Sequence, residues 1–216
     1  MVRVEVWGNM ACFTRPEFKV ERITYDVITP SAARAILDSI YWHPGLKWHV
    51  DKIYVLNPIQ YTDVMRNEVK LKASGQQAIR AMKGDETPLF LDSVKQRTQR
   101  TTKVLQNVHY VIEAHFTMTK NASDSDNEGK FCTIMKSRLA KGRCFNEPYF
   151  GCREFPAFFR EWNGGIIPTI HETRDLGYML YDMDYTVPGR IMPVYFKAKM
   201  ENGVVDTGKE VVQLLS

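Results

Sequence analysis

The chain has 216 residues, of which 44% are hydrophobic and 25% are charged. These values are typical of a globular protein with one sizeable core, and they exclude a disordered, collagenous or coiled-coil chain. The 29 basic and 25 acidic side chains leave a formal charge of +4, which alone predicts no particular partner, and the apolar runs are too short to cross a bilayer.

The first 55 residues predict a strand, a helix and a second strand. Residues 2–6 alternate between valine and polar neighbours, as a half-buried strand does, and they lack the apolar core of a signal peptide. A Thr-Pro pair is a typical opening for the helix over residues 29–40, which has an apolar stripe. The alternation of residues 48–55 slips at Asp51-Lys52, which predicts a β-bulge.

The middle of the chain contains a weakly patterned segment followed by a strong strand. Residues 58–107 are polar and predict a binding insertion, whose best strand pattern is at 66–72. Residues 108–118 alternate cleanly and predict a strand, and a loop follows them. A second helix is expected over residues 130–141, and its expected inward side chains are Ile134, Leu139 and Ala140. Residues 149–159 predict another strand region.

The order strand, helix, strand, strand, helix, strand is that of the ferredoxin-like fold. We therefore expect an α+β protein, with a ferredoxin-like domain of the RNA-recognition-motif type over residues 1–163. Short strand-like runs after Gly164 predict a C-terminal antiparallel β-sheet extension over residues 164–216, with a hairpin turn at Asn202-Gly203. Four cysteines without CxxC spacing indicate reduced thiols. We expect a cytoplasmic protein with no membrane contact.

The charge is unevenly distributed along the chain. Residues 1–163 hold 24 basic and 18 acidic side chains, a formal +6, whereas residues 164–216 hold 5 and 7, a formal −2. The stretches 93–112 and 129–146 contain basic residues and no acid, so they are candidate surfaces for a polyanion. The alternative is that each is a solvated loop or helix face. The candidate phosphate contacts are Lys95, Arg97, Arg100, Lys103, Lys136, Arg138, Lys141 and Arg143.

The sequence contains no P-loop, GxGxxG, GxSxG or HExxH pattern, so we expect no nucleotide cofactor and no metal. The two predicted helices of a ferredoxin-like fold pack on one face of the sheet. They would place Tyr41 and Lys130 on either side of a phosphodiester. Taken singly, Tyr41 is more typical of a core edge, and Lys130 is more typical of the surface.

Several segments in order resemble the CRISPR-associated Cas-five family in its type I-C (Dvulg) form, whose members process the precursor of CRISPR RNA. The resemblance covers roughly residues 2–160. The longest pieces are VWGNMACFTRPEFKVERITYDVITPSAARAILDSIYWHPGLKWHVDKIYVLNPI and QRTTKVLQNVHYVIEAHF. RNEV, DNEGKF and YFGCREFPAFF are shorter pieces, and the likeness resumes weakly at MENGVV.

The resemblance implies an endoribonuclease that cleaves CRISPR repeat RNA at the base of its hairpin without a metal. It also implies that the mature crRNA stays bound by its 5′ handle in a surveillance complex, together with the backbone and large type I-C subunits. The family's catalytic Tyr falls on Tyr41 and its Lys on Lys130. The His that follows this Lys in the family falls on Phe131, so it is missing from this chain.

The missing histidine bears directly on the expected chemistry. Attack by the 2′-OH gives a 2′,3′-cyclic phosphate and requires a proton acceptor, a proton donor and positive charge. Lys130 can supply the charge and Tyr41 a proton, but phenylalanine cannot shuttle one. We hypothesise that His43 partly fills the vacancy, with His49 and His115 as the next candidates. The simpler alternative is that His43 only forms a hydrogen bond near the helix end.

Other functions remain open at this point. The chain could be a non-catalytic RNA-binding subunit whose nuclease activity Phe131 has weakened. It could instead bind duplex DNA nonspecifically through its basic stretches, whereas a small-molecule enzyme would lack any cofactor motif. Repeat RNA would be recognised by the shape of its stem and by stacking of unpaired bases. Trp42 and Tyr61 are candidates for such stacking, although core packing is the more usual role.

Overall fold

The computed structural model describes residues 1–18, 20–86, 89–187, 189–208 and 212–215. Three helices and nine strands lie within these residues. In chain order they are β1 (Val2–Ala11), α1 (Pro30–Ile40), β2 (Leu46–Val55), β3 (Tyr61–Val69), α2 (Gly75–Met82), β4 (Arg97–Met118), α3 (Glu128–Lys141), β5 (Phe158–Glu161), β6 (Arg174–Val187), β7 (Arg190–Glu201), β8 (Val204–Asp206) and β9 (Leu214–Leu215). Among the described residues, no helix combines the length and the hydropathy that spanning a membrane requires.

One antiparallel sheet organises the molecule. Its strands lie in the order β5-β1-β4-β2-β8-β7-β6, while β3 also pairs with β4 and β9 with β7. The register of β2 on β4 shifts between Val50 and Lys52, which confirms the bulge predicted at Asp51-Lys52. The expected α+β class is confirmed, and the strands predicted for the domain and for its extension belong to one large antiparallel sheet.

Helices α1 and α3 pack against the central strands. The side chain of Thr29 caps α1 by accepting the N–H of Ala32, and Pro30 opens the helix as predicted. The buried residues of α1 are Pro30, Ala33, Ile36, Leu37 and Ile40. In α3 the buried residues are Phe131, Met135 and Leu139, which are spaced four apart on one helical face.

The predicted inward face of α3 was wrong in part. Leu139 is buried, but Ile134 is only half-buried and Ala140 is exposed. The reason is the position of Phe131, whose ring contacts Phe116 of β4 with a centroid separation of 6.0 Å. This contact turns the face that holds Phe131 toward the sheet and leaves Ala140 in solvent.

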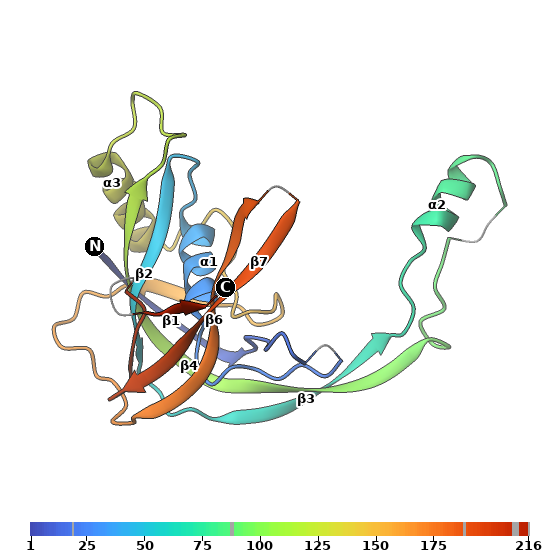
Figure 1. Ribbon diagram of the computed structural model, residues 1–216, viewed down its shortest axis with the longest axis horizontal. Coiled ribbons are helices and arrows are strands. Elements are labelled where there is room, and N and C mark those ends of the chain that lie inside the picture. Colours follow the sequence, from blue (N-terminus) through green and yellow to red (C-terminus); the bar gives the residue numbers. More distant parts are fainter. Residues whose placement is uncertain (19, 87–88, 188, 209–211, 216) are drawn as a thin grey trace.

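A long two-stranded arm carries α2 away from the core. Figure 1 shows β3 and the first part of β4 extending together from the sheet, with α2 at the far end. The segment predicted as an insertion thus contains a full strand, and β4 begins at Arg97, well before the strand predicted at 108–118. One face of this ribbon is exposed and the other is half-buried over most of its length, and its side chains are mostly polar, so its sequence lacks the apolar alternation of a strand packed on a core.

The C-terminal strands continue the same sheet. β6 and β7 form a long antiparallel pair, and β8 joins them to β2. Asn202 and Gly203 have φ values of 48° and 73°, which confirms the predicted hairpin turn. The strand region predicted over residues 149–159 is shorter than expected, because β5 begins only at Phe158.

Candidate functional site

Tyr41 ends α1 and lies at the boundary of the core. Its backbone N–H donates to the carbonyl of Leu37 over 2.8 Å, and its own carbonyl accepts the indole N–H of Trp48 over 3.0 Å. The residue is 4% exposed, and this burial raises the pKa of its phenol above the ordinary value. The guanidinium of Arg138 lies 5.0 Å from the centre of the Tyr41 ring. The phenol is therefore protonated at neutral pH.

Lys130 is held by a carboxylate in the loop before α3. Its Nζ donates to Oδ1 of Asp126 over 2.8 Å. The other oxygen of Asp126, Oδ2, accepts the backbone N–H and the hydroxyl of Ser123, each over 2.9 Å. The Asp126 side chain is only 2% exposed, whereas that of Lys130 is 43% exposed. The hydrogen bond from Lys130 holds the pKa of Asp126 well below its usual range.

His43 faces the same carboxylate from the other side. Its Nε2 lies 3.9 Å from Oδ2 of Asp126, and its Nδ1 accepts the backbone N–H of Gly45 over 3.0 Å. Because Nδ1 is an acceptor, the neutral ring must carry its proton on Nε2. In this arrangement, His43 can donate a hydrogen bond to a phosphate oxygen, but it has no free lone pair with which to accept a proton.

Phe131 fills the interior of this cluster. It is 0% exposed, and its ring centre lies 6.0 Å from that of Tyr41 and 4.9 Å from that of His43. The structure thus gathers Tyr41, His43 and Lys130 where α1 ends and α3 begins, with Phe131 packed among them. Their roles in catalysis stay predictions.

His49 and His115 do not join this cluster. They are paired across β2 and β4, and their rings stack with centroids 5.1 Å apart. Nδ1 of His115 contacts a carboxylate oxygen of Asp51 at 2.8 Å. Trp48 points toward Tyr41 and the helices, so His49, the next residue of the strand, points to the opposite face.

The two basic stretches lie in different places. Figure 1 shows α3 on one side of the core and the arm that holds the start of β4 on the other. On the arm, Arg100 pairs with Glu68 over 3.2 Å, Lys95 pairs with Asp92 over 3.5 Å, and Lys103 lies 4.8 Å from the ring centre of Tyr61. Arg100 and Arg138 are half-buried, and the exposed candidate contacts are Lys95, Arg97, Lys103, Lys136, Lys141 and Arg143.

Arg138 has a structural role that the sequence did not suggest. Its Nη1 donates to the carbonyl of Ile40 over 2.5 Å, while its guanidinium covers Tyr41. One of the unsatisfied carbonyls at the end of α1 thereby gains a charged donor. Asp126 was also missed, because it stands in a polar loop. Its spacing of four residues from Lys130 is a signal from which the pair could have been predicted.

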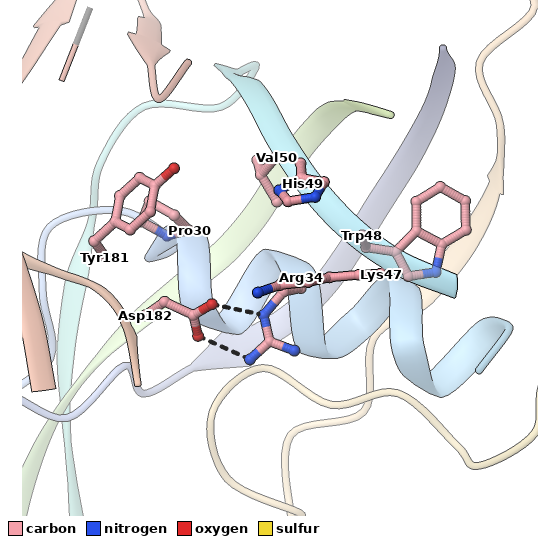
Figure 2. A pocket seen from close by; sticks show the side chains of 8 residues that line it. All are labelled: Pro30, Arg34, Lys47, Trp48, His49, Val50, Tyr181 and Asp182. Atoms are coloured by element: carbon pink, nitrogen blue, oxygen red, sulfur yellow. Dashed lines mark hydrogen bonds and ion pairs between the residues drawn. The ribbon is translucent and has the colours of Figure 1, made fainter. Parts of the chain in front are cut away.

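A second ion pair connects α1 to the C-terminal strands. Figure 2 shows Arg34 of α1 making two hydrogen bonds to Asp182 of β6, over 3.1 and 2.8 Å. Arg34 also binds Asp38, one turn further along α1, over 2.7 Å. The small cavity beside this pair has a volume of about 80 Å³. It is lined by Pro30, Arg34, Lys47, Trp48, His49, Val50, Tyr181 and Asp182.

Comparison with known proteins identifies relatives along nearly the whole chain. Residues 1–207 match the Cas5d model described as CRISPR-associated protein (Cas_Cas5). A protein of Mannheimia succiniciproducens is 45% identical over 212 residues, covering 95% of this chain and 93% of the relative. A protein of Thermus thermophilus is 35% identical over 231 residues, covering 99% and 94% respectively. Both are named CRISPR pre-crRNA endoribonuclease Cas5d.

Solved structures share the fold at lower sequence identity. The crystal structure of a CRISPR-associated protein gives a TM-score of 0.68 at 22% identity, covering 100% of this chain and 96% of that one. A functionally uncharacterized protein from Streptococcus mutans gives 0.67 at 21% identity, with coverages of 98% and 96%. Together with the family match, the relatives confirm what the ordered sequence segments predicted: the chain belongs to the Cas5d family of CRISPR-associated proteins.

Proposed function

We propose that this chain is an endoribonuclease that cleaves CRISPR repeat RNA at the base of its hairpin. The names of its relatives support an endoribonuclease that acts on pre-crRNA. The observation that carries the proposal is the cluster at the ends of α1 and α3, where His43 and Lys130 approach opposite oxygens of Asp126. Tyr41 lies beside them against Phe131.

The proposed reaction is an internal transfer within the RNA. The 2′-oxygen attacks the neighbouring phosphorus and the bond from phosphorus to the 5′-oxygen breaks, giving a 2′,3′-cyclic phosphate and a 5′-hydroxyl. One proton leaves the 2′-hydroxyl, and one is delivered to the 5′-oxygen. Phenol, ammonium and imidazole groups can assist these transfers by acid–base and electrostatic catalysis, so we propose that the reaction needs no metal.

Each side chain has a role that follows from its surroundings. Tyr41 donates the proton to the leaving oxygen, because its raised pKa keeps the phenol protonated. Lys130 stabilises the negative charge of the phosphorane, and Asp126 fixes its position. His43 donates its Nε2 proton as a hydrogen bond to a phosphate oxygen. This role refines the hypothesis that His43 replaces the missing shuttle, since its Nδ1 is occupied by Gly45.

No group in this arrangement accepts the 2′-proton. We therefore propose that hydroxide ion takes it, which makes the enzyme slow and its rate dependent on pH. The rate should rise about tenfold per pH unit and continue rising past neutrality. A rate that levels off near pH 6.5, the ordinary pKa of histidine, would show instead that a histidine is the base.

The order of the strands and helices supports a more specific fold assignment. We propose that residues 1–163 form a ferredoxin-like domain of the RNA-recognition-motif type, with residues 164–216 as its extension. The order β5-β1-β4-β2, with α1 between β1 and β2 and α3 between β4 and β5, supports this assignment. No named helix or strand crosses residue 164 among the described residues, which supports the division.

The partners are proposed from the family resemblance. We propose that the mature crRNA remains bound and that the chain works in the cytoplasm within a type I-C surveillance complex, beside its backbone and large subunits. Duplex DNA is the competing polyanion for the exposed basic residues. Competition between repeat hairpin and random duplex DNA at one salt concentration tests this, because phosphate contacts alone give no preference.

The test of the cleavage site uses labelled repeat RNA in the presence of a chelator. The wild type is expected to give a product ending in a 2′,3′-cyclic phosphate, identified by its mass. Tyr41→Phe and Lys130→Ala should each lower the single-turnover rate about a hundredfold. The matched controls Tyr178→Phe and Lys197→Ala, both on strands of the extension, should cleave normally. Full activity in both site variants would overturn this site, and binding without cleavage would favour a non-catalytic RNA-binding subunit.

A further inference from the structure

Two large aromatic side chains are exposed beside the candidate cleavage cluster. Trp42 is 52% exposed and Phe145 is 59% exposed, although core packing was the expected role of Trp42. Their rings are stacked, with centroids 6.2 Å apart and planes inclined by 30°. Exposed aromatic surface of this kind is costly in water and marks a binding site more often than a solvated face.

The chain holds this aromatic pair in place. Trp42 follows the C-cap of α1, and the segment after α3 is hydrogen-bonded to that same helix end. The backbone N–H groups of Phe145 and Asn146 donate to the carbonyl of Ser39 over 2.8 and 3.0 Å. Because these bonds satisfy a free carbonyl at the helix end, the rings are positioned before any ligand binds.

The pair stands at one end of a groove made of two adjoining cavities. The first has a volume of about 330 Å³ and is lined by Asp38, Ser39, Trp42, Phe145 and Asn146. The second has a volume of about 440 Å³ and is lined by Ser39, Asn146, Glu147, Pro148, Tyr149, Arg153 and Pro156. Since they share Ser39 and Asn146, the cavities adjoin each other, and we call them together the platform groove.

The side chains of the platform groove match the chemistry of single-stranded RNA. Aromatic rings at Trp42, Phe145 and Tyr149, the last 40% exposed, offer faces on which bases can stack. Arg153 can bind phosphate or stack on a base, and Asn146 can bond base edges. Two acids also line the groove, but Asp38 is neutralised by Arg34 over 2.7 Å. Glu147 lines the same cavity as the basic residue Arg153.

We propose that the platform groove binds unpaired nucleotides of the RNA next to the cleaved phosphodiester, with one base stacked on Trp42 and Phe145. Trp42 lies between Tyr41 and His43 in the chain, so the aromatic pair is next to the cleavage cluster in sequence. The proposal rests on the proposed function for the identity of the RNA. Its test requires binding only, so a failure of cleavage and a failure of the groove give different results.

Tryptophan fluorescence gives a direct test. The chain contains four tryptophans, and a base stacked on Trp42 quenches its emission. Addition of a short single-stranded oligoadenylate should therefore quench the wild type. Trp42→Phe keeps an aromatic ring, so it should bind with nearly unchanged affinity while the quenching disappears. Persistent quenching in Trp42→Phe would place the base on another tryptophan and overturn the proposal.

Affinity measurements complete the test. Trp42→Ala and Phe145→Ala should each weaken oligoadenylate binding about tenfold at a fixed salt concentration. Tyr178→Ala, which removes a 61% exposed aromatic ring from β6, should leave it unchanged. If the alanine variants bind RNA as well as the wild type, the proposal is wrong and the pair is a surface for a protein partner. If binding weakens while cleavage is absent from every form, the groove stands and the proposed endoribonuclease activity fails.

Discussion

Replacing Phe131 with histidine tests whether the cluster lacks only a proton shuttle. Phe131 is fully buried and contacts the rings of Tyr41, His43 and Phe116. Phe131→His places an imidazole against the first two of these rings. If hydroxide is the base in the wild type, the new group should raise the single-turnover rate at pH 7 at least tenfold, since general base catalysis contributes about 10²–10⁴.

The same substitution should cost stability, and the structure indicates how much. Three aromatic contacts, each worth about 0.5–1.5 kcal/mol, are weakened, and a buried ring nitrogen without a partner costs about 1–3 kcal/mol. Part of the free energy lost from the aromatic contacts is recovered, because the imidazole is also a flat ring. We expect the free energy of unfolding to fall by about 2–4 kcal/mol, which lowers Tm by roughly 5–15 °C for a chain of this size.

The stability loss should depend on pH in a definite direction. Burial lowers the pKa of the new imidazole below its unfolded value of about 6.5. Below this pH the unfolded state binds more protons than the folded state, so the variant loses further stability as the pH falls. Its Tm deficit relative to the wild type should therefore be larger at pH 5.5 than at pH 8.

Phe131→Leu is the matched control for Phe131→His. It loses the ring contacts but adds no titratable group, so its Tm deficit should be the same at both pH values and its rate should not rise. The assays are thermal unfolding and single-turnover cleavage of labelled repeat RNA across pH 5.5–9. A cleavage rate for Phe131→His that stays at or below the wild-type value, with the same pH profile, would refute the lost-shuttle explanation.

Three further substitutions test contacts around α1 and α3. Asp126→Asn should lower Tm at pH 7. The difference from the wild type should shrink steadily as the pH falls below about 4, because the depressed pKa of this carboxyl stabilises the fold only while it is ionised. Arg138→Ala should lower the free energy of unfolding by about 1–2 kcal/mol in chemical denaturation, since the carbonyl of Ile40 loses a charged donor; an unchanged midpoint would contradict this role. Arg34→Ala should lower the free energy of unfolding by about 1–3 kcal/mol, because it leaves Asp182 without its bidentate partner. The double variant Arg34→Ala/Asp182→Asn should recover part of this loss.

The elements that the sequence predicted well are those with one buried face. The Thr-Pro opening and apolar stripe determined α1 to within a residue, and the alternation located the start of β1, although that strand continues to Ala11. Burial on one side imposes a period on the side chains of both elements. The arm has no such constraint. β3 and the start of β4 have one exposed and one half-buried face with mostly polar side chains, so only their mutual pairing identifies them as strands.

The sequence predicted the parts of the candidate site that lie at the ends of the two predicted helices. Placing Tyr41 and Lys130 near each other needed only two helices on one face of a sheet, and the family resemblance selected these two residues from the rest. The contacts of Asp126 and Arg138 depend on the directions of their side chains, which the sequence pattern does not give. A basic residue in an acid-free stretch predicts a phosphate contact, yet Arg138 turns inward to the end of α1 because an unsatisfied carbonyl lies within its reach.

The residue at position 131 affects both the stability of the cluster and the chemistry proposed for it. A residue at this position is enclosed by Tyr41, His43 and β4, so the packing there favours an apolar ring, while acid–base catalysis favours an imidazole. Phenylalanine satisfies the packing but has no group that could accept the 2′-proton of the proposed reaction. In that proposal, placement of the RNA depends on Lys130 and on rings outside the core, of which Trp42 follows Tyr41 in the chain. We therefore expect Phe131→His to change the rate of cleavage far more than the affinity for repeat RNA.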